Sequence, residues 1–155
     1  MTVTIGRREL LVALGGTAAA WPIAARAQQP EQMRRVVVLM STGEDDPQDA
    51  TRLAAFERGL QELGWVIGRN LNIDYRWAAG DPDSLRKYAT ELRVLAPDAI
   101  VASGTQAFTA AQQTTRTVPI VFVNIVDPVS SGFVSSLAQP GGNATGFLMF
   151  EYATS

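Results

Sequence analysis

The sequence predicts an α/β fold, a doubly wound parallel sheet whose strands alternate with helices. Apolar runs rich in β-branched residues, such as Val36 to Met40, lack a polar alternation and indicate strands buried on both faces. Each run is followed by a capping residue and then by apolar residues at helical spacing. Repeated strand–helix order predicts parallel strands joined by right-handed crossovers.

The first half of the chain supplies two strands and two helices. A strand over residues 34–40 leads into a helix that starts at Asp46 and Pro47, which suit the cap and the first turn. The expected buried face of that helix consists of Leu53, Phe56, Leu60 and Leu63. Apolar and polar residues alternate over 70–77, which predicts a strand with one wet face, at or near the sheet edge. A second helix is expected between Asp81 and Pro97.

The second half repeats the same alternation with shorter elements. Buried strands are expected over 98–102 and 118–123, with a helix over 106–115 between them that packs through small residues. Asp127 and Pro128 resemble a helix start, so a further helix is expected over 129–137. The run 144–150 has the composition of one more strand.

Composition narrows the chemistry available to these 155 residues. Outside the first 27 residues the chain holds 10 basic and 14 acidic residues, so no basic patch indicates nucleic acid. The chain has no cysteine and no histidine, which removes the commonest thiolate and imidazole chemistry. No dinucleotide fingerprint or P-loop follows a strand. We therefore expect no catalytic residues, no metal and no cofactor, although carboxylate chemistry stays open.

The N-terminus has the pattern of an export signal over residues 1–27. Arg7 and Arg8 precede an uncharged apolar run from Leu10 to Ala20, and a small-x-small motif ends at Ala27. Both a twin-arginine and an ordinary secretory signal fit this pattern. Cleavage after Ala27 would leave a short linker over 28–33. Because there is no cysteine to carry a lipid, the product is expected in the periplasm without a stable membrane anchor.

Small and polar residues follow three of the predicted strands at their carboxyl ends, where sheets of this kind bind ligands. They suit hydrogen bonds to a small polar ligand, and helix starts at Thr105 and Asp127 would favour a ligand carboxylate. For any one of these residues ordinary helix capping or a turn is the favoured interpretation, and for the set together ligand binding is favoured. The strand ends concerned are residues 41–43, 103–105 and 124–128.

Three blocks of sequence resemble the ABC transporter substrate-binding protein family. The most specific is VPIVFVNIVDPVSSGFVSSLAQPGGNATGF, in which a strand, a DPV segment and a PGGN crossover follow one another. The others are GLQELGWVIGRNLNIDYRWAAGD and DAIVASGTQAFTAAQQTT. Together they extend the resemblance over about residues 34–150.

The resemblance implies a periplasmic-binding-protein type I-like fold of two lobes that close on a ligand. It implies an extracytoplasmic component of an ABC importer that captures a small polar ligand, amino acids included, and docks on a permease. On the matching positions of this sequence, the resemblance implies that the candidate ligand-binding residues are Ser41, Thr42, Gly104, Thr105, Asn124 and Asp127. The family's chains are about twice as long. We therefore expect the first lobe over 34–142, and over 143–155 a crossover and the start of a missing second lobe. A periplasmic enzyme using carboxylates and an extracytoplasmic sensor lobe remain as alternatives.

Overall fold

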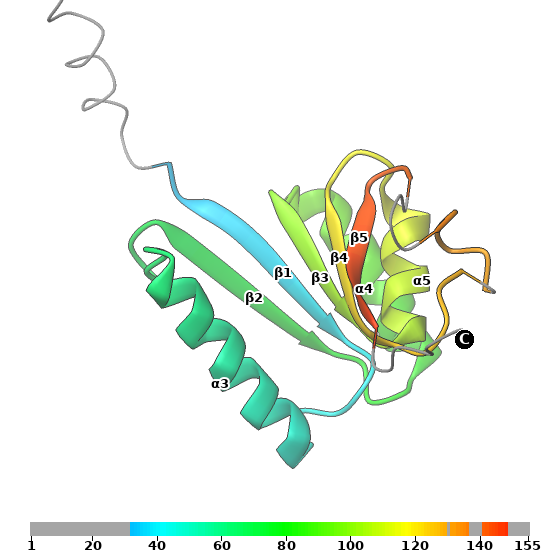
Figure 1. Cartoon of the computed structure of the whole chain (residues 1–155), viewed down its shortest axis with the longest axis horizontal. Coiled ribbons are helices and arrows are strands. Elements are labelled where there is room, and N and C mark those ends of the chain that lie inside the picture. The colour runs from blue at the N-terminus through cyan, green and yellow to red at the C-terminus, as the bar shows by residue number, and fades with distance from the viewer. Residues whose placement is uncertain (1–31, 130, 137–140, 149–155) are drawn as a thin grey trace, which may run out of the picture. The chain divides into compact units, whose positions relative to one another are not determined.

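The computed structural model describes residues 32–129, 131–136 and 141–148 (Figure 1). The chain divides into two units, residues 1–32 and 33–155, and every described helix and strand lies in the second. The expected export signal therefore lies outside the described residues. The elements, in chain order, are β1 (Arg34–Met40), α3 (Pro47–Glu62), β2 (Leu71–Trp77), α4 (Pro82–Leu95), β3 (Ala99–Ser103), α5 (Thr105–Thr114), β4 (Ile120–Ile125) and β5 (Ala144–Leu148).

The five strands form one parallel sheet in the order β2-β1-β3-β4-β5, which confirms the predicted fold class. β2 lies at one edge, as its alternating pattern predicted. β1 is an interior strand between β2 and β3, and β3 occupies the centre. From β1 the chain continues to β2 at one edge of the sheet, whereas from β3 it continues to β4 in the other direction. The connections that leave these two neighbouring strands therefore lie on opposite sides of the sheet.

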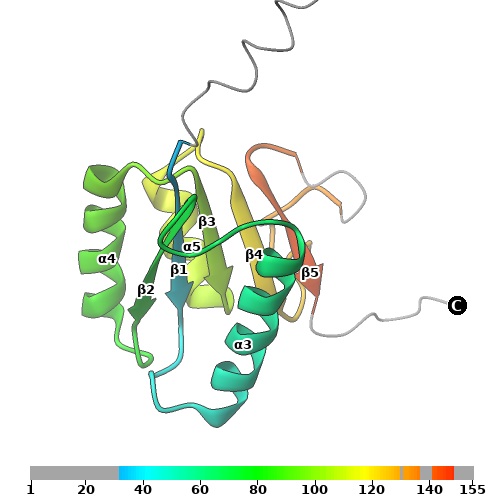
Figure 2. The same cartoon turned by 90° about the vertical axis from the view of Figure 1, so that its left-hand side faces the viewer.

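Two different faces result from this winding. Figure 2 shows α3 on one side of the sheet and α5 on the other, with α4 beside α5. We call the side that carries α4 and α5 the closed face and the side that carries α3 the open face. The hydrophobic core lies on the closed face, where alternate strand residues such as Val37, Ile100 and Phe122 are fully buried.

The predicted caps of the first two helices are present. The Asp46 carboxylate accepts the backbone N–H of Gln48 at 2.9 Å at the start of α3. The Asp81 carboxylate accepts the backbone N–H of Ser84 at 3.0 Å and the Ser84 hydroxyl at 2.7 Å at the start of α4. These hydrogen bonds stabilise the ionised form and lower the pKa of Asp81. Local sequence therefore determines where both helices begin.

The face of α3 that was predicted to be buried is buried only in part. Leu53, Phe56 and Leu60 are only half-buried, and Leu63 is 78% exposed. The one fully buried residue of the helix is a carboxylate, Asp49. An apolar stripe becomes buried only where a second surface covers it, and the described chain leaves α3 incompletely covered.

The helix expected over 129–137 does not form over its described residues. The segment folds into turns, in which the Gly132 N–H donates to the Val129 carbonyl at 2.9 Å and the Phe133 N–H to the Pro128 carbonyl at 2.9 Å. Gly132 has φ of +72°, a left-handed conformation that interrupts a right-handed helix. The cap-like Asp127-Pro128 pair therefore begins a turn.

The strand expected to open a second lobe belongs to the first sheet. β5 pairs in parallel with β4, with Ile120 opposite Ala144 and Phe122 opposite Gly146. A Cβ built on Gly146 would lie 2.0 Å from the Phe122 carbonyl oxygen, so the pairing depends on glycine at this position. The sheet therefore extends past residue 142.

Candidate functional site

The carboxyl ends of β1 and β3 form the first part of the candidate site. Gly104, the N-cap of α5, has φ of +89° and no side chain with which to cap the helix. The Ser41 hydroxyl, at the end of β1, accepts the backbone N–H of Ala107 at 3.1 Å instead. A Cβ at residue 104 would lie 2.7 Å from the Ser41 oxygen, so glycine lets the two strands approach. Ser41 thus caps α5 from another strand.

The start of α5 keeps donors for a ligand. Thr105 and Gln106 lie in the first turn, where backbone N–H groups have no partner within the helix, and both residues are exposed. The positive end of the helix dipole adds to their attraction for an anion. Gly104 and Thr105, two of the candidate ligand-binding residues, therefore lie at the start of α5.

The loop after β1 and the first turns of α3 form an ionic cluster around one buried carboxylate. The Thr42 hydroxyl donates to the carboxylate of Asp49, which is only 1% exposed, and Arg52 pairs with the same carboxylate at 3.1 Å. The Thr42 proton is therefore directed into the protein, although Thr42 itself is exposed. The sequence analysis missed Asp49 and Arg52, because an acid in a first helical turn is expected for reasons of helix dipole alone.

Asn124, the last residue but one of β4, has an uncommon backbone conformation. Its φ is +59°, a left-handed value that asparagine adopts more readily than most residues, and it lies at an irregularity in the β4–β5 register. Its side-chain amide donates to the hydroxyl of Ser103, which is 7% exposed, at 2.9 Å. Ser103 was missed as part of the site. A polar residue in a buried apolar run was the available signal.

The structure brings four of the six predicted residues together at the carboxyl-terminal end of the sheet. Ser41 and Gly104 are in contact, Thr105 continues from Gly104, and Asn124 reaches them through Ser103. Thr42 turns toward Asp49. Asp127 is exposed in the turn after β4, where its carbonyl accepts the Ser131 N–H at 3.3 Å.

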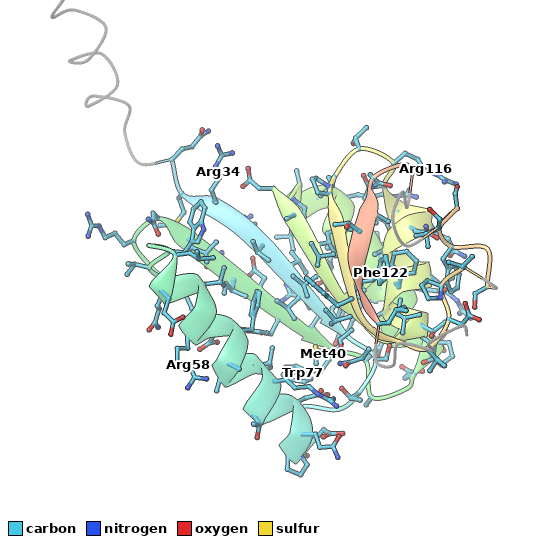
Figure 3. All side chains as sticks on the ribbon, viewed as in Figure 1. Arg34, Met40, Arg58, Trp77, Arg116 and Phe122 are labelled. Carbon is cyan, nitrogen blue, oxygen red and sulfur yellow. The ribbon has the colours of Figure 1, made fainter. Side chains whose placement is uncertain are left out.

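A groove of about 380 Å³ opens beside this end of the sheet, on the open face. Figure 3 shows Met40 and Trp77 together at the carboxyl ends of β1 and β2, the end at which Met40 meets the groove. The lining is mostly apolar, with a polar end made by Ser103, Asn124 and the Asp49–Arg52 pair. The groove was not predicted, because its two walls come from α3 and from β1, β3, β4 and β5. The lining residues are Val38, Met40, Asp49, Arg52, Leu53, Phe56, Val101, Ser103, Val123, Asn124, Phe147 and Leu148.

Other kinds of site find little support in the part of the chain described. Within residues 32–129, 131–136 and 141–148, no three acidic residues gather in a way that could hold a metal ion. No helix among those residues combines the length and the apolar character needed to span a bilayer. The arrangement offers backbone donors, hydroxyls and an amide, which suit reversible hydrogen bonding.

A parallel sheet whose strand order reverses between β1 and β3 has the architecture of the doubly wound α/β class, whose members bind ligands at that point. A family model described as "ABC transporter substrate binding protein" matches residues 35–151. The chain belongs to this family. The resemblance found in the three sequence blocks is thereby confirmed.

Individual relatives are similar to this chain in sequence and in structure. A tyrosine-binding protein of Clostridioides difficile (strain R20291) is 34% identical over 91 residues, 59% of this chain and 26% of that protein. The ligand-free, open structure of a substrate-binding protein with adhesive properties from Clostridium difficile superposes with a TM-score of 0.70 at 29% identity, over 78% of this chain and 40% of that one.

A third relative was solved with a ligand. A domain from Streptococcus pneumonia in complex with L-Trp has a TM-score of 0.68 and 25% identity, over 76% of this chain and 39% of that one. The chain therefore spans about a quarter of the curated relative and about two fifths of the solved ones. The similarity is to one part of each longer protein.

Proposed function

We propose that this chain is the first lobe of an extracytoplasmic solute-binding protein of an ABC importer, with an amino acid as its ligand. The observation that carries the proposal is the start of α5, where Ser41 caps the helix from β1 and the first-turn residues Thr105 and Gln106 are exposed. A ligand carboxylate there would accept backbone hydrogen bonds and meet the positive end of the helix dipole.

The polar groups around α5 fit the rest of an amino acid. The Ser103 and Asn124 side chains, joined by a 2.9 Å hydrogen bond, lie on the adjoining strands, and the Thr105 hydroxyl is at an exposed residue. One relative is described as binding tyrosine and another was solved with L-Trp. These relatives make aromatic amino acids the first ligands to test.

The proposal includes a second lobe and a partner. Relatives of this family are more than twice as long as the matched region, so a binding crevice closed from both sides would need groups beyond this chain. The full protein would capture its ligand in the periplasm by lobe closure and deliver it to a permease, without turnover. The lobe alone is therefore expected to bind weakly, with a Kd of about 1 mM or more, because half of the contacts are missing.

Titration of residues 28–155 by 15N NMR tests the role of α5. L-Tyr and L-Trp are expected to shift the amide signals of Thr105 and Gln106, whereas tyramine and tryptamine, which lack the carboxylate, are expected to leave them unchanged. Thr105→Pro removes one N–H at a position where proline suits a helix start, and α3 and α4 already carry proline there. It is expected to weaken binding several-fold with an unchanged circular dichroism spectrum.

Two results would contradict the proposal. Micromolar binding by residues 28–155 alone would show that the lobe needs no second half. Equal affinity for amino acids and for the amines without a carboxylate would remove the start of α5 from the binding site. Thr109→Ser, one turn further along α5, is the matched control and should bind as the unchanged chain does.

A further inference from the structure

A separate, polar pocket lies at the end of the sheet opposite the candidate ligand site. Its volume is about 390 Å³, and its walls come from the end of α5, the turns after Pro128 and the start of β5. Figure 3 shows Arg116, which follows α5, at the other end of the strands from Met40. None of the described residues that line this pocket lines the groove beside α3 or is a candidate ligand-binding residue. The pocket is therefore distinct from the site described above.

The pocket carries a positive charge that nothing in its described lining neutralises. Arg116 is the one charged residue among the described residues that line it. Within the part of the chain that the structure describes, no hydrogen bond or ion pair engages the Arg116 guanidinium. Its five N–H donors are therefore available, and their planar fork suits the oxygens of an anion such as phosphate.

Two glycines bring backbone donors to the same pocket. Gly141 and Gly142 have consecutive left-handed conformations, with φ of +74° and +61°. Successive N–H groups in turns form concavities that bind anions, and no side chain covers them at glycine. Among the described residues, neither N–H has an acceptor. The Ser135 hydroxyl oxygen lies 3.5 Å from the position of a Cβ built on Gly141, so it adds a further donor beside this turn.

Hydrogen bonds hold both walls of the pocket in place. On one wall, the Asn143 amide donates to the Val118 carbonyl at 2.6 Å, and the Asn143 carbonyl accepts the Ile120 N–H at 2.8 Å. On the other wall, the Gln112 amide donates to the Phe133 carbonyl at 3.1 Å. The segments that carry the donors are therefore positioned before an ion arrives, which lowers the entropic cost of binding.

We propose that this pocket binds a tetrahedral oxyanion of the phosphate type, between the Arg116 guanidinium, the Ser135 hydroxyl and the N–H groups of Gly141 and Gly142. Such an ion has enough oxygens to accept from three segments of the chain at once, whereas a carboxylate has two. The pocket has room for the free ion and for a phosphate ester such as a phospholipid headgroup. The inference goes beyond the solute-binding role, because the pocket shares no residue with the start of α5.

Titration of 15N-labelled residues 28–155, a range that contains the whole compact unit, with sodium phosphate at constant ionic strength tests the proposal. The amide signals of Gly141 and Gly142 are expected to shift and to saturate, and sodium chloride is expected to leave them unchanged. Arg116→Gln is expected to weaken binding at least tenfold. Arg93→Gln is the matched control, because Arg93 is also exposed, lies near the end of α4 and carries the same charge.

Two further measurements keep this pocket separate from the start of α5 and from a fault in folding. Any phosphate-induced shift of Thr105 and Gln106 should persist in Arg116→Gln, because those residues lie at the opposite end of the strands. Ser135→Ala changes only an exposed hydroxyl and is expected to weaken binding about twofold or more, with the remaining amide signals in place.

Vesicles distinguish the two sources of phosphate. Co-sedimentation of residues 28–155 with phosphatidylglycerol vesicles, lost in Arg116→Gln and in competition with sodium phosphate, would identify a lipid headgroup as the ligand. Binding of sodium phosphate without co-sedimentation would identify the free ion. The proposal is overturned if phosphate produces no saturable shift at Gly141 and Gly142, or if Arg116→Gln and Arg93→Gln weaken binding equally.

Discussion

The two faces of the sheet use similar sequence patterns and reach different degrees of burial. On the closed face, Phe108 of α5 is fully buried and its ring lies 5.2 Å from those of Phe122 and Phe133, in edge-to-face contact. On the open face, Phe56 of α3 is half-buried at the wall of a groove. Helical spacing of apolar residues therefore identifies which side of a helix faces inward, and the presence of a covering layer decides how much of it is buried.

The largest expected difference between the faces comes from truncating one phenylalanine on each. Phe108→Ala should lower the free energy of unfolding by about 3–5 kcal/mol, because it removes a ring from a close-packed core and leaves a cavity. Phe56→Ala should lower it by less than about 2 kcal/mol, since a half-buried ring loses less contact. Urea unfolding of the two variants measures the difference, and equal losses would contradict the contrast between the faces.

Alanine substitutions at two glycines test how the backbone is packed on the two faces. Gly146→Ala should lower the free energy of unfolding by about 1–3 kcal/mol, because its Cβ would lie 2.0 Å from the Phe122 carbonyl oxygen. Gly59→Ala should raise it by up to about 1 kcal/mol, because no atom lies within 4 Å of its Cβ and alanine favours the helix. Thermal unfolding distinguishes these opposite signs. A stable Gly146→Ala variant would show that β5 is not held against β4 as described.

The helices on the two faces differ in where the residue that caps their first turn comes from. Ser41→Ala should lower the free energy of unfolding by about 1 kcal/mol, because the Ala107 N–H loses an acceptor supplied by another strand. Asp46→Ala should have a similar effect on α3 through a local cap. Hydrogen exchange separates the two, since Ser41→Ala should speed exchange in the first turn of α5 and Asp46→Ala in that of α3. Faster exchange in α3 alone for both variants would contradict the cap across strands.

An effect of similar size, which depends on pH, concerns the link between α3 and β2. The Tyr75 hydroxyl donates to the Glu57 carboxylate at 2.5 Å, and burial together with this carboxylate raises the pKa of Tyr75 above its usual value of about 10. The protonated tyrosine therefore contributes stability below pH 10 that is lost as the pH rises further. Tyr75→Phe should lower the free energy of unfolding by about 1 kcal/mol at pH 7. The loss should shrink above pH 10, and a pH-independent difference would argue against the hydrogen bond.

Much of the fold could be predicted because its signals are local. The buried run of β1, the alternation in β2 and the caps at Asp46 and Asp81 each identify an element from neighbouring residues. The helix expected after Pro128 failed because the left-handed Gly132 interrupts it. β5 was assigned to the wrong lobe, because a strand's composition does not say which sheet it joins.

The location of the candidate residues could be predicted better than their hydrogen-bond partners. Ligand edges of parallel sheets follow from strand order, so Ser41, Gly104, Thr105 and Asn124 lie together as expected. Their partners could not be predicted, since Ser41 contacts a residue 66 positions away.

The sequence by itself determined the strand–helix alternation, the starts of α3 and α4 and the family, because each depends on short patterns of residues. Tertiary structure alone decided which face is covered, which polar groups are used for capping and which stay exposed at the start of α5. The physical reason is that burial and hydrogen-bond partners depend on contacts between segments far apart in the chain. Those contacts exist only once β1, β3 and β4 lie side by side.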